Sequence, residues 1–127
     1  MEPVSLWMLV AHLAGDFPLQ PSWVARKKTW YDSEGSERIE GIIALTFHVV
    51  IHGLLFLPIA FFTLPTITHI AVFLLWVVGT HAIIDSRRWM EPKEGWSNDG
   101  MMWVWLNDQI MHLAALSLAY PIVIALL

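Results

Sequence analysis

Apolar residues form four long stretches in this chain, and charged or turn-forming residues gather between them. An α-helix needs about 20 mostly apolar residues to cross a hydrocarbon core of ~30 Å, so each stretch is predicted to be a membrane-spanning helix. The predicted spans cover residues 3–23, 41–64, 65–86 and 101–127. The uncharged link at 63–68 predicts a tight turn. Together these elements predict an all-α fold, in which residues 1–127 form a single integral membrane four-helix bundle.

The first stretch is the least regular of the four, because Gly15, Asp16 and Pro18 interrupt its apolar run. The residues before it, from Met1 to Pro3, carry no positive charge, and no small-residue cleavage site is evident. A cleaved signal peptide is therefore not expected.

Composition agrees with a membrane protein. The chain is 57% hydrophobic and only 14% charged, and its mean hydropathy is +0.58. A soluble domain of 127 residues does not need such long uncharged runs. The lipid bilayer is the expected partner, and the net charge of -4 disfavours a nucleic-acid partner.

Positive charges indicate how the helices are oriented in the membrane. All the lysine and arginine residues lie in two segments, 24–40 and 87–100. They are Arg26, Lys27, Lys28, Arg38, Arg87, Arg88 and Lys93. With four spans both segments lie on one side, so the positive-inside bias predicts that they are cytoplasmic loops and that the N- and C-termini are outside.

Four pairs of histidine or aspartate residues lie inside the apolar stretches, one pair in each, with the two members four positions apart. A four-residue step turns a helix by about 400°, so both members lie on one face, roughly 6 Å apart along the axis. The pairs are His12/Asp16, His48/His52, His81/Asp85 and Asp108/His112. Four such faces can build one metal site inside a bundle. His69 has no partner at this spacing and is expected to be interfacial.

The predicted topology sorts these residues by depth, because consecutive spans run in opposite directions. The residues expected nearer the cytoplasm are Asp16, His48, Asp85 and Asp108. Those expected deeper in the membrane are His12, His52, His81 and His112. The prediction is a layer of three carboxylates and one imidazole over a layer of four imidazoles, about one helical turn apart.

A divalent transition metal ion explains why aspartates stand inside apolar helices. A central Asp costs about 2.5–3.5 kcal/mol on insertion scales, and a cation offsets its charge. Imidazole together with carboxylate suits zinc, iron or manganese better than calcium, and zinc is expected, as one or two ions. The predicted metal ligands are His12, Asp16, His48, His52, His81, Asp85, Asp108 and His112. The same residues also permit one ion with supporting Asp–His contacts, or a metal-free polar network.

The order of the motifs resembles a known family. The motifs are His12-Leu13-Ala14-Gly15-Asp16-Phe17-Pro18-Leu19-Gln20, the pair His48 and His52, His81-Ala82-Ile83-Ile84-Asp85, and Asp108-Gln109-Ile110-Met111-His112. Over nearly the whole chain this pattern is similar to a small prokaryotic and phage membrane-protein family of unknown function, which implies the four-helix membrane fold and no established activity. More distantly, the spacing resembles that of membrane-bound metal-dependent hydrolases and zinc-dependent phospholipase C, an analogy of ligand pattern. Gln20 and Gln109 are interpreted as hydrogen-bonding residues beside the ligands, with substrate contact as the alternative.

Metal-assisted hydrolysis is the reaction that this ligand set favours, because a metal brings the pKa of bound water towards ~7 and makes a nucleophile without serine or cysteine. The expected substrate is a phosphoester in a lipid or lipid-linked molecule at the cytoplasmic leaflet. One of Asp16, Asp85 and Asp108 is expected to act as general base. Two alternatives stay open: a di-iron membrane oxidoreductase acting on acyl chains, and a non-enzymatic protein with a structural metal or an ion or proton path.

Overall fold

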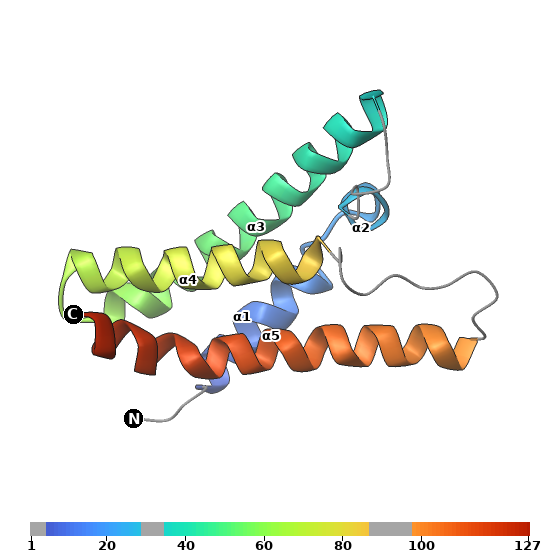
Figure 1. Cartoon of the computed structure of the whole chain (residues 1–127). Helices are drawn as coiled ribbons and strands as arrows, with labels where there is room; N and C mark the ends of the chain where they lie inside the picture. Colours follow the sequence, from blue (N-terminus) through green and yellow to red (C-terminus); the bar gives the residue numbers. More distant parts are fainter. Residues whose placement is uncertain (1–4, 29–34, 87–97) are drawn as a thin grey trace.

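The computed structural model describes residues 5–28, 35–86 and 98–127, and within these ranges every regular element is an α-helix. The helices are α1 (Leu6–Asp16), α2 (Ser22–Lys27), α3 (Gly35–Thr63), α4 (Ile67–Asp85) and α5 (Asn98–Leu126). Figure 1 shows α3, α4 and α5 as the three long elements and α1 and α2 as short ones. The all-α prediction is confirmed for this part of the chain.

Three helices, α3, α4 and α5, are long and apolar enough to cross a membrane. Even α4, with 19 residues, extends for about 29 Å at 1.5 Å per residue. Only 28% of the apolar window of each helix is buried inside the structure. Large apolar side chains, among them Phe62, Leu75 and Leu118, therefore stand on the outer surface. An apolar exterior around buried histidine and aspartate is the arrangement expected of a protein surrounded by lipid.

The structure does not confirm a first span over 3–23, because α1 is too short to cross a membrane. It has 11 residues, or about 16 Å, which is roughly half of the hydrocarbon thickness. The helix ends at Asp16, and its C-cap Phe17 has left the helical conformation at φ -116° and ψ -81°. Pro18 explains this end, since proline disfavours the helical conformation of the residue before it. Three spans are therefore supported, and a fourth remains a prediction.

The predicted tight turn at 63–68 is confirmed. Helix α3 ends at Thr63 and α4 begins at Ile67. Thr66 caps α4 through its hydroxyl, which accepts a hydrogen bond from the backbone N–H of His69 at 3.3 Å. Because the link is so short, α3 and α4 pack as neighbours; α5 packs against α4, and α1 and α2 pack against α3 (Figure 1).

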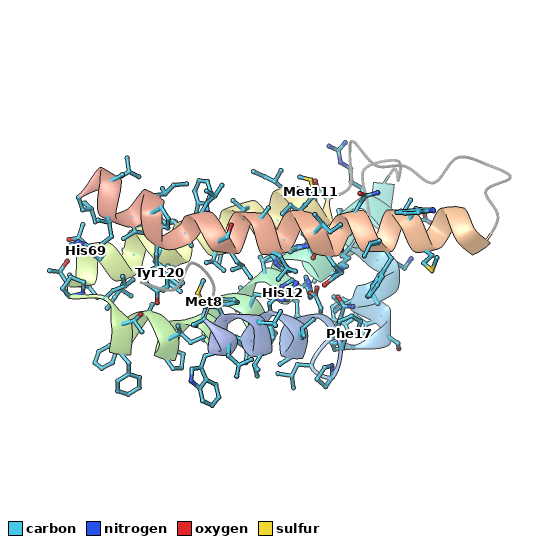
Figure 2. All side chains as sticks on the ribbon, turned by 90° about the horizontal axis from the view of Figure 1, so that it is seen from below. Met8, His12, Phe17, His69, Met111 and Tyr120 are labelled. Carbon is cyan, nitrogen blue, oxygen red and sulfur yellow. The ribbon has the colours of Figure 1, made fainter. Side chains whose placement is uncertain are left out.

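An apolar core fills the bundle between the buried polar residues and the α3–α4 turn. Its largest members include Phe56, Phe73 and Tyr120, and the Phe73 ring centroid lies 5.3 Å from that of Tyr120. Met8 contributes from α1 and is fully buried. Figure 2 shows Met8 and Tyr120 between His12 and His69. The packing of Met8 in this core therefore holds α1 against the long helices. His12, one helical turn further along α1, can then reach the buried polar residues.

The two loops predicted to be cytoplasmic, 24–40 and 87–100, are described only in part. Residues 29–34 and 87–97 lie outside the described residues. Which side of the membrane these loops and the two termini occupy stays a prediction.

Candidate metal centre

All eight predicted ligands are buried, and each comes from the helix predicted to carry it. Helix α1 supplies His12 and Asp16, α3 His48 and His52, α4 His81 and Asp85, and α5 Asp108 and His112. None of them is more than 8% exposed. His69, by contrast, is only half-buried, bonds to the Thr66 hydroxyl at 2.6 Å and lies at the far end of the bundle from His12 (Figure 2). The four-residue spacing thus separates the clustered histidines from the isolated one.

Asp16 lies at the centre of one group of ligand atoms. Its Oδ1 is 3.2 Å from Nε2 of His52, 3.3 Å from Nε2 of His48 and 3.5 Å from Nε2 of His81. The four ligand atoms all lie within 4.8 Å of one another. Ligands about 2.0–2.1 Å from a tetrahedral zinc ion are roughly 3.3 Å apart, so the spacing around Asp16 has the dimensions of a four-coordinate metal site. We call these four residues the Asp16 group.

The tautomers of two histidines direct lone pairs at carboxylate oxygens. Nδ1 of His52 lies 3.1 Å from the backbone carbonyl oxygen of His48, and Nδ1 of His112 lies 2.9 Å from that of Asp108. A carbonyl oxygen only accepts, so in the neutral imidazole Nδ1 carries the hydrogen and Nε2 carries the lone pair. Each residue thereby presents its Nε2 as a metal ligand, with its orientation set by its own helix.

Several of these atoms are buried without a hydrogen-bond partner among the described residues. They are Nε2 of His52, Nε2 of His112, Oδ1 of Asp16 and Oδ1 of Asp85. The Nε2 lone pair of His52 faces Asp16 Oδ1 at 3.2 Å, which brings two acceptors together with no hydrogen between them. Buried polar atoms are nearly always satisfied, and two facing acceptors are stabilised when a proton or a metal cation lies between them. The arrangement therefore fits a metal ion.

Asp85 connects the rest of the cluster. Its Oδ2 lies 2.7 Å from Nε2 of His48 and 3.3 Å from Nε2 of His81, while its Oδ1 faces Nε2 of His112 at 3.6 Å. His81, Asp85 and His112 form a second group with metal-ligand spacing, which we call the Asp85 group. His12, Asp16 and His112 form a third. The three groups share members, so they are parts of one continuous centre.

The two predicted layers are only partly present. The imidazoles that were assigned to the deeper layer do pack together, with ring centroids 3.7 Å apart for His52 and His81 and 4.2 Å apart for His81 and His112. The separation of about one helical turn is wrong, however, because Asp16 and Asp85 reach directly to the Nε2 atoms of deeper histidines. Aspartate is long enough to close that gap where the helices approach each other closely. The result is one interlocked cluster.

Asp108 lies beside this cluster but outside the three groups of metal-ligand spacing found among the described residues. Its Oδ2 is 3.8 Å from Nδ1 of His112 and accepts a hydrogen bond from the Gln109 side chain at 3.2 Å. Asp108 is 3% exposed, so it contributes to the electrostatics of the centre even where it does not contact the same atoms.

Lys28 is a member of the cluster that the sequence pattern did not reveal. It is 7% exposed, and its Nζ donates to Asp85 Oδ2 at 3.0 Å and lies 3.4 Å from His48 Nε2. The sequence placed Lys28 among the loop cations, where the positive-inside bias accounts for it. Lys28 has Asp32 four positions later, but both residues lie in the charged segment between two apolar stretches, so the spacing gave no reason to place Lys28 among the buried residues.

Residues 4–126 match the family model of DUF3307, which is described as a protein of unknown function. The chain belongs to the DUF3307 family. The predicted membership of an uncharacterised family is therefore confirmed over almost the whole chain. No curated protein and no solved structure matches the chain. The more distant resemblance to zinc-dependent hydrolases has no support from these comparisons.

In this DUF3307 chain, Gly15 of the Gly15-Asp16 motif allows α1 to approach α3. A Cβ on Gly15 would lie 2.5 Å from both Cε1 and Nε2 of His52, closer than real Cβ contacts. A larger residue would therefore push α1 and His52 apart. The glycine thus permits Asp16, the next residue, to reach the imidazoles of α3.

Gln109 of the DUF3307 chain is a hydrogen-bonding residue beside the ligands, as the sequence suggested. Its Oε1 lies 3.2 Å from Nε2 of His12, and its side-chain nitrogen donates to Asp16 Oδ2 at 3.2 Å. The same nitrogen donates to Asp108 Oδ2 at 3.2 Å. Gln109 therefore ties α5 to both α1 ligands and orients Asp16, whose Oδ1 is left to face the three imidazoles.

Proposed function

We propose that this DUF3307 protein is an integral membrane metalloprotein that binds a divalent transition metal, zinc in preference to iron or manganese. The Asp16 group would hold the ion. The observation that carries the proposal is the meeting of the His52 Nε2 lone pair and Asp16 Oδ1 at 3.2 Å, in a site where His52 Nδ1 is already bonded to its own helix. This donor set of imidazoles and one carboxylate is typical of zinc.

Charge balance supports a cation at this place. Asp16 and Asp85 bring two carboxylates into the bundle, and Lys28 supplies one ammonium group, which contacts Asp85. A net negative charge therefore remains before Asp108 is counted. Carboxylates inside a membrane are costly unless they are paired, and a divalent ion supplies the missing positive charge at the point where the ligand atoms converge.

We further propose that the centre hydrolyses a phosphoester in a lipid or lipid-linked substrate at the cytoplasmic leaflet. When bound, a divalent metal that takes a water in addition to the four residues of the Asp16 group would bring the pKa of that water towards ~7 and polarise a phosphoryl oxygen. Asp85 is well arranged to accept a proton as general base, because Lys28 donates to its Oδ2 while its Oδ1 has no hydrogen-bond partner among the described residues. The loop cations would attract an anionic headgroup.

A groove between α1 and α3 supports an acyl chain as part of the substrate. It encloses about 680 Å³, within the usual range of ligand sites. Its lining is mainly apolar and includes Val10, Ala11, Leu55, Ile59 and Phe62. Ala11, one of the lining residues, is next to the ligand His12 in the chain, so one end of the groove lies one residue along α1 from a ligand of the metal centre. A chain lying there would place a headgroup near the ligands.

Elemental analysis tests the proposal most directly. Protein purified in detergent without chelators should contain zinc, and the variant H52A should lose most of it, while H69A, changed at the far end of α4, should keep it. Zinc-loaded protein should then hydrolyse a long-chain phosphoester such as phosphatidic acid, and a chelator should stop the reaction. Metal-free wild-type protein would refute the metal centre, whereas iron with oxygen consumption would indicate an oxidoreductase.

A further inference from the structure

Lys28 is a buried lysine that follows α2 and reaches into the metal centre. It is 7% exposed, whereas the side chain of the preceding Lys27 is 43% exposed and pairs with Glu40 at 3.2 Å on the surface. Lysine is almost never fully buried unless it is paired. The two neighbouring lysines therefore have different roles, and the burial of Lys28 points to a function inside the cluster.

The ammonium group of Lys28 contacts the carboxylate that a second metal ion would need. Asp85 Oδ2 has Lys28 Nζ at 3.0 Å, His48 Nε2 at 2.7 Å and His81 Nε2 at 3.3 Å. An ion in the Asp85 group would share this carboxylate with a fixed positive charge. Like charges this close repel strongly where water is excluded. The carboxylate of Asp16, in contrast, is approached by three imidazole nitrogens, which are neutral ligands for a cation.

We propose that Lys28 acts as a built-in second cation, which restricts the centre to a single divalent ion in the Asp16 group. The inference rests on the proposed metal centre and specifies its stoichiometry. Lys28 donates to Asp85 at 3.0 Å, and it approaches the Asp16 group through His48 Nε2, at the longer distance of 3.4 Å. Lys28 thereby determines how many metal ions the centre binds, and it does so through its contact with Asp85.

The ligand count shows what removal of the ammonium would allow. His81 belongs to both the Asp16 group and the Asp85 group, and its Nε2 can coordinate one ion at a time. Without Lys28, one ion would keep Asp16, His48 and His52, while a second would take His81, Asp85 and His112. Each ion would then have three protein ligands, the number found in many catalytic zinc sites. The chain thus holds enough ligands for two ions, and the fixed charge selects one.

Metal titration of the full-length protein in detergent tests this inference, with Zn²⁺ as the probe and bound metal measured after gel filtration. Wild-type protein should bind about one ion per chain, and K28M should bind about two, the number that the ligand count permits. K28R, which keeps the positive charge, should stay near one. The double variant K28M/D85N, which also removes the carboxylate of the second group, should return to one.

The possible outcomes separate this inference from the metal centre itself. Wild-type protein that binds no metal contradicts the centre; wild-type protein that binds two ions, or K28M that still binds one, contradicts the role of Lys28 alone. A second measurement does not depend on the folding of K28M. Wild-type protein loaded with Mn²⁺ should give the electron paramagnetic resonance spectrum of an isolated ion, and a spectrum of two coupled ions would overturn the inference.

Discussion

The backbone of Gly15 lies against the imidazole of His52, so that a Cβ at position 15 would be 2.5 Å from His52 Nε2. Because this nitrogen is one of the ligand atoms of the Asp16 group, the smallest possible enlargement of residue 15 should disturb metal binding. We expect G15A to lower zinc affinity about tenfold or more, as changes to residues that orient ligands commonly do. Elemental analysis and a competition titration with a chromogenic chelator measure the effect.

Gly79 provides the matched control for that substitution. A Cβ at Gly79 would meet nothing within 4 Å, and the residue lies inside α4. We expect G79A to keep full metal content and to gain roughly 0.5–1 kcal/mol of stability, because alanine loses less conformational entropy than glycine in a helix. Equal loss of metal in both variants would mean that any added methyl group disrupts the bundle, and the role assigned to Gly15 would fail.

Asp16 and Asp108 should differ in their importance for metal binding, although the sequence pattern treats them alike. Asp16 Oδ1 is within 3.5 Å of three imidazole nitrogens, while Asp108 lies outside the three ligand groups of the described residues. D16N should abolish zinc binding, because an amide is a poor zinc ligand and supplies no negative charge. D108N should reduce affinity by less. Isothermal titration calorimetry with Zn²⁺ measures the affinity of the two variants. Similar losses of affinity would show that Asp108 also ligates the ion.

The placement of each pair on one helical face could be predicted because it depends on local periodicity. A step of four places His12 with Asp16 and His81 with Asp85 on single helical faces whatever the surroundings. The depth at which their side chains meet could not be predicted. That depth depends on how closely the helices approach, which Gly15 and the packed core determine in three dimensions.

The burial of Lys28 is a second feature that could not be predicted from the sequence. It stands next to Lys27 in the chain, and hydropathy and the positive-inside bias treat the two residues identically. Their different burial follows from the direction of α2, which begins after Pro21 and ends at Lys27. The extent of α1 was also missed, because the apolar run continues to Leu19 although Pro18 ends the helical conformation before it.

Gln109 should support metal binding without touching the ion. Its side chain contacts His12 Nε2 and donates to Asp16 Oδ2, each at 3.2 Å. Q109L keeps the approximate volume and removes both hydrogen bonds, so we expect zinc affinity to fall 10- to 100-fold, the usual effect of losing a hydrogen bond to a ligand. Asn107 is the control, because it is exposed and bonds only locally to the Trp103 carbonyl oxygen among the contacts seen here. If N107L and Q109L have the same zinc affinity in a chelator competition, Gln109 does not support metal binding.

Cysteine labelling tests the orientation of the helices, and the chain has no cysteine of its own to interfere. Ser36 is exposed in the first turn of α3, and Thr68 is exposed in the first turn of α4, at the opposite end of the α3–α4 pair. The positive-inside bias predicts that S36C reacts with a membrane-impermeant maleimide only after the cell is opened and that T68C reacts in intact cells. The reverse result would place the metal centre near the outer face instead.

The groove beside α1 should control which substrates reach the centre. Ile59 lines the groove, so I59W should fill part of its 680 Å³ and exclude an acyl chain. We expect hydrolysis of long-chain phosphatidic acid to fall about tenfold, which is the loss that follows when roughly 1.4 kcal/mol of binding energy is removed. Metal content and hydrolysis of a short soluble phosphoester should stay unchanged, because the substitution lies outside the ligand groups.

Leu75, 74% exposed on α4, provides the control L75W, which adds the same side chain to the outer surface. Equal loss of activity towards both substrates in I59W would indicate that the groove has a structural role only.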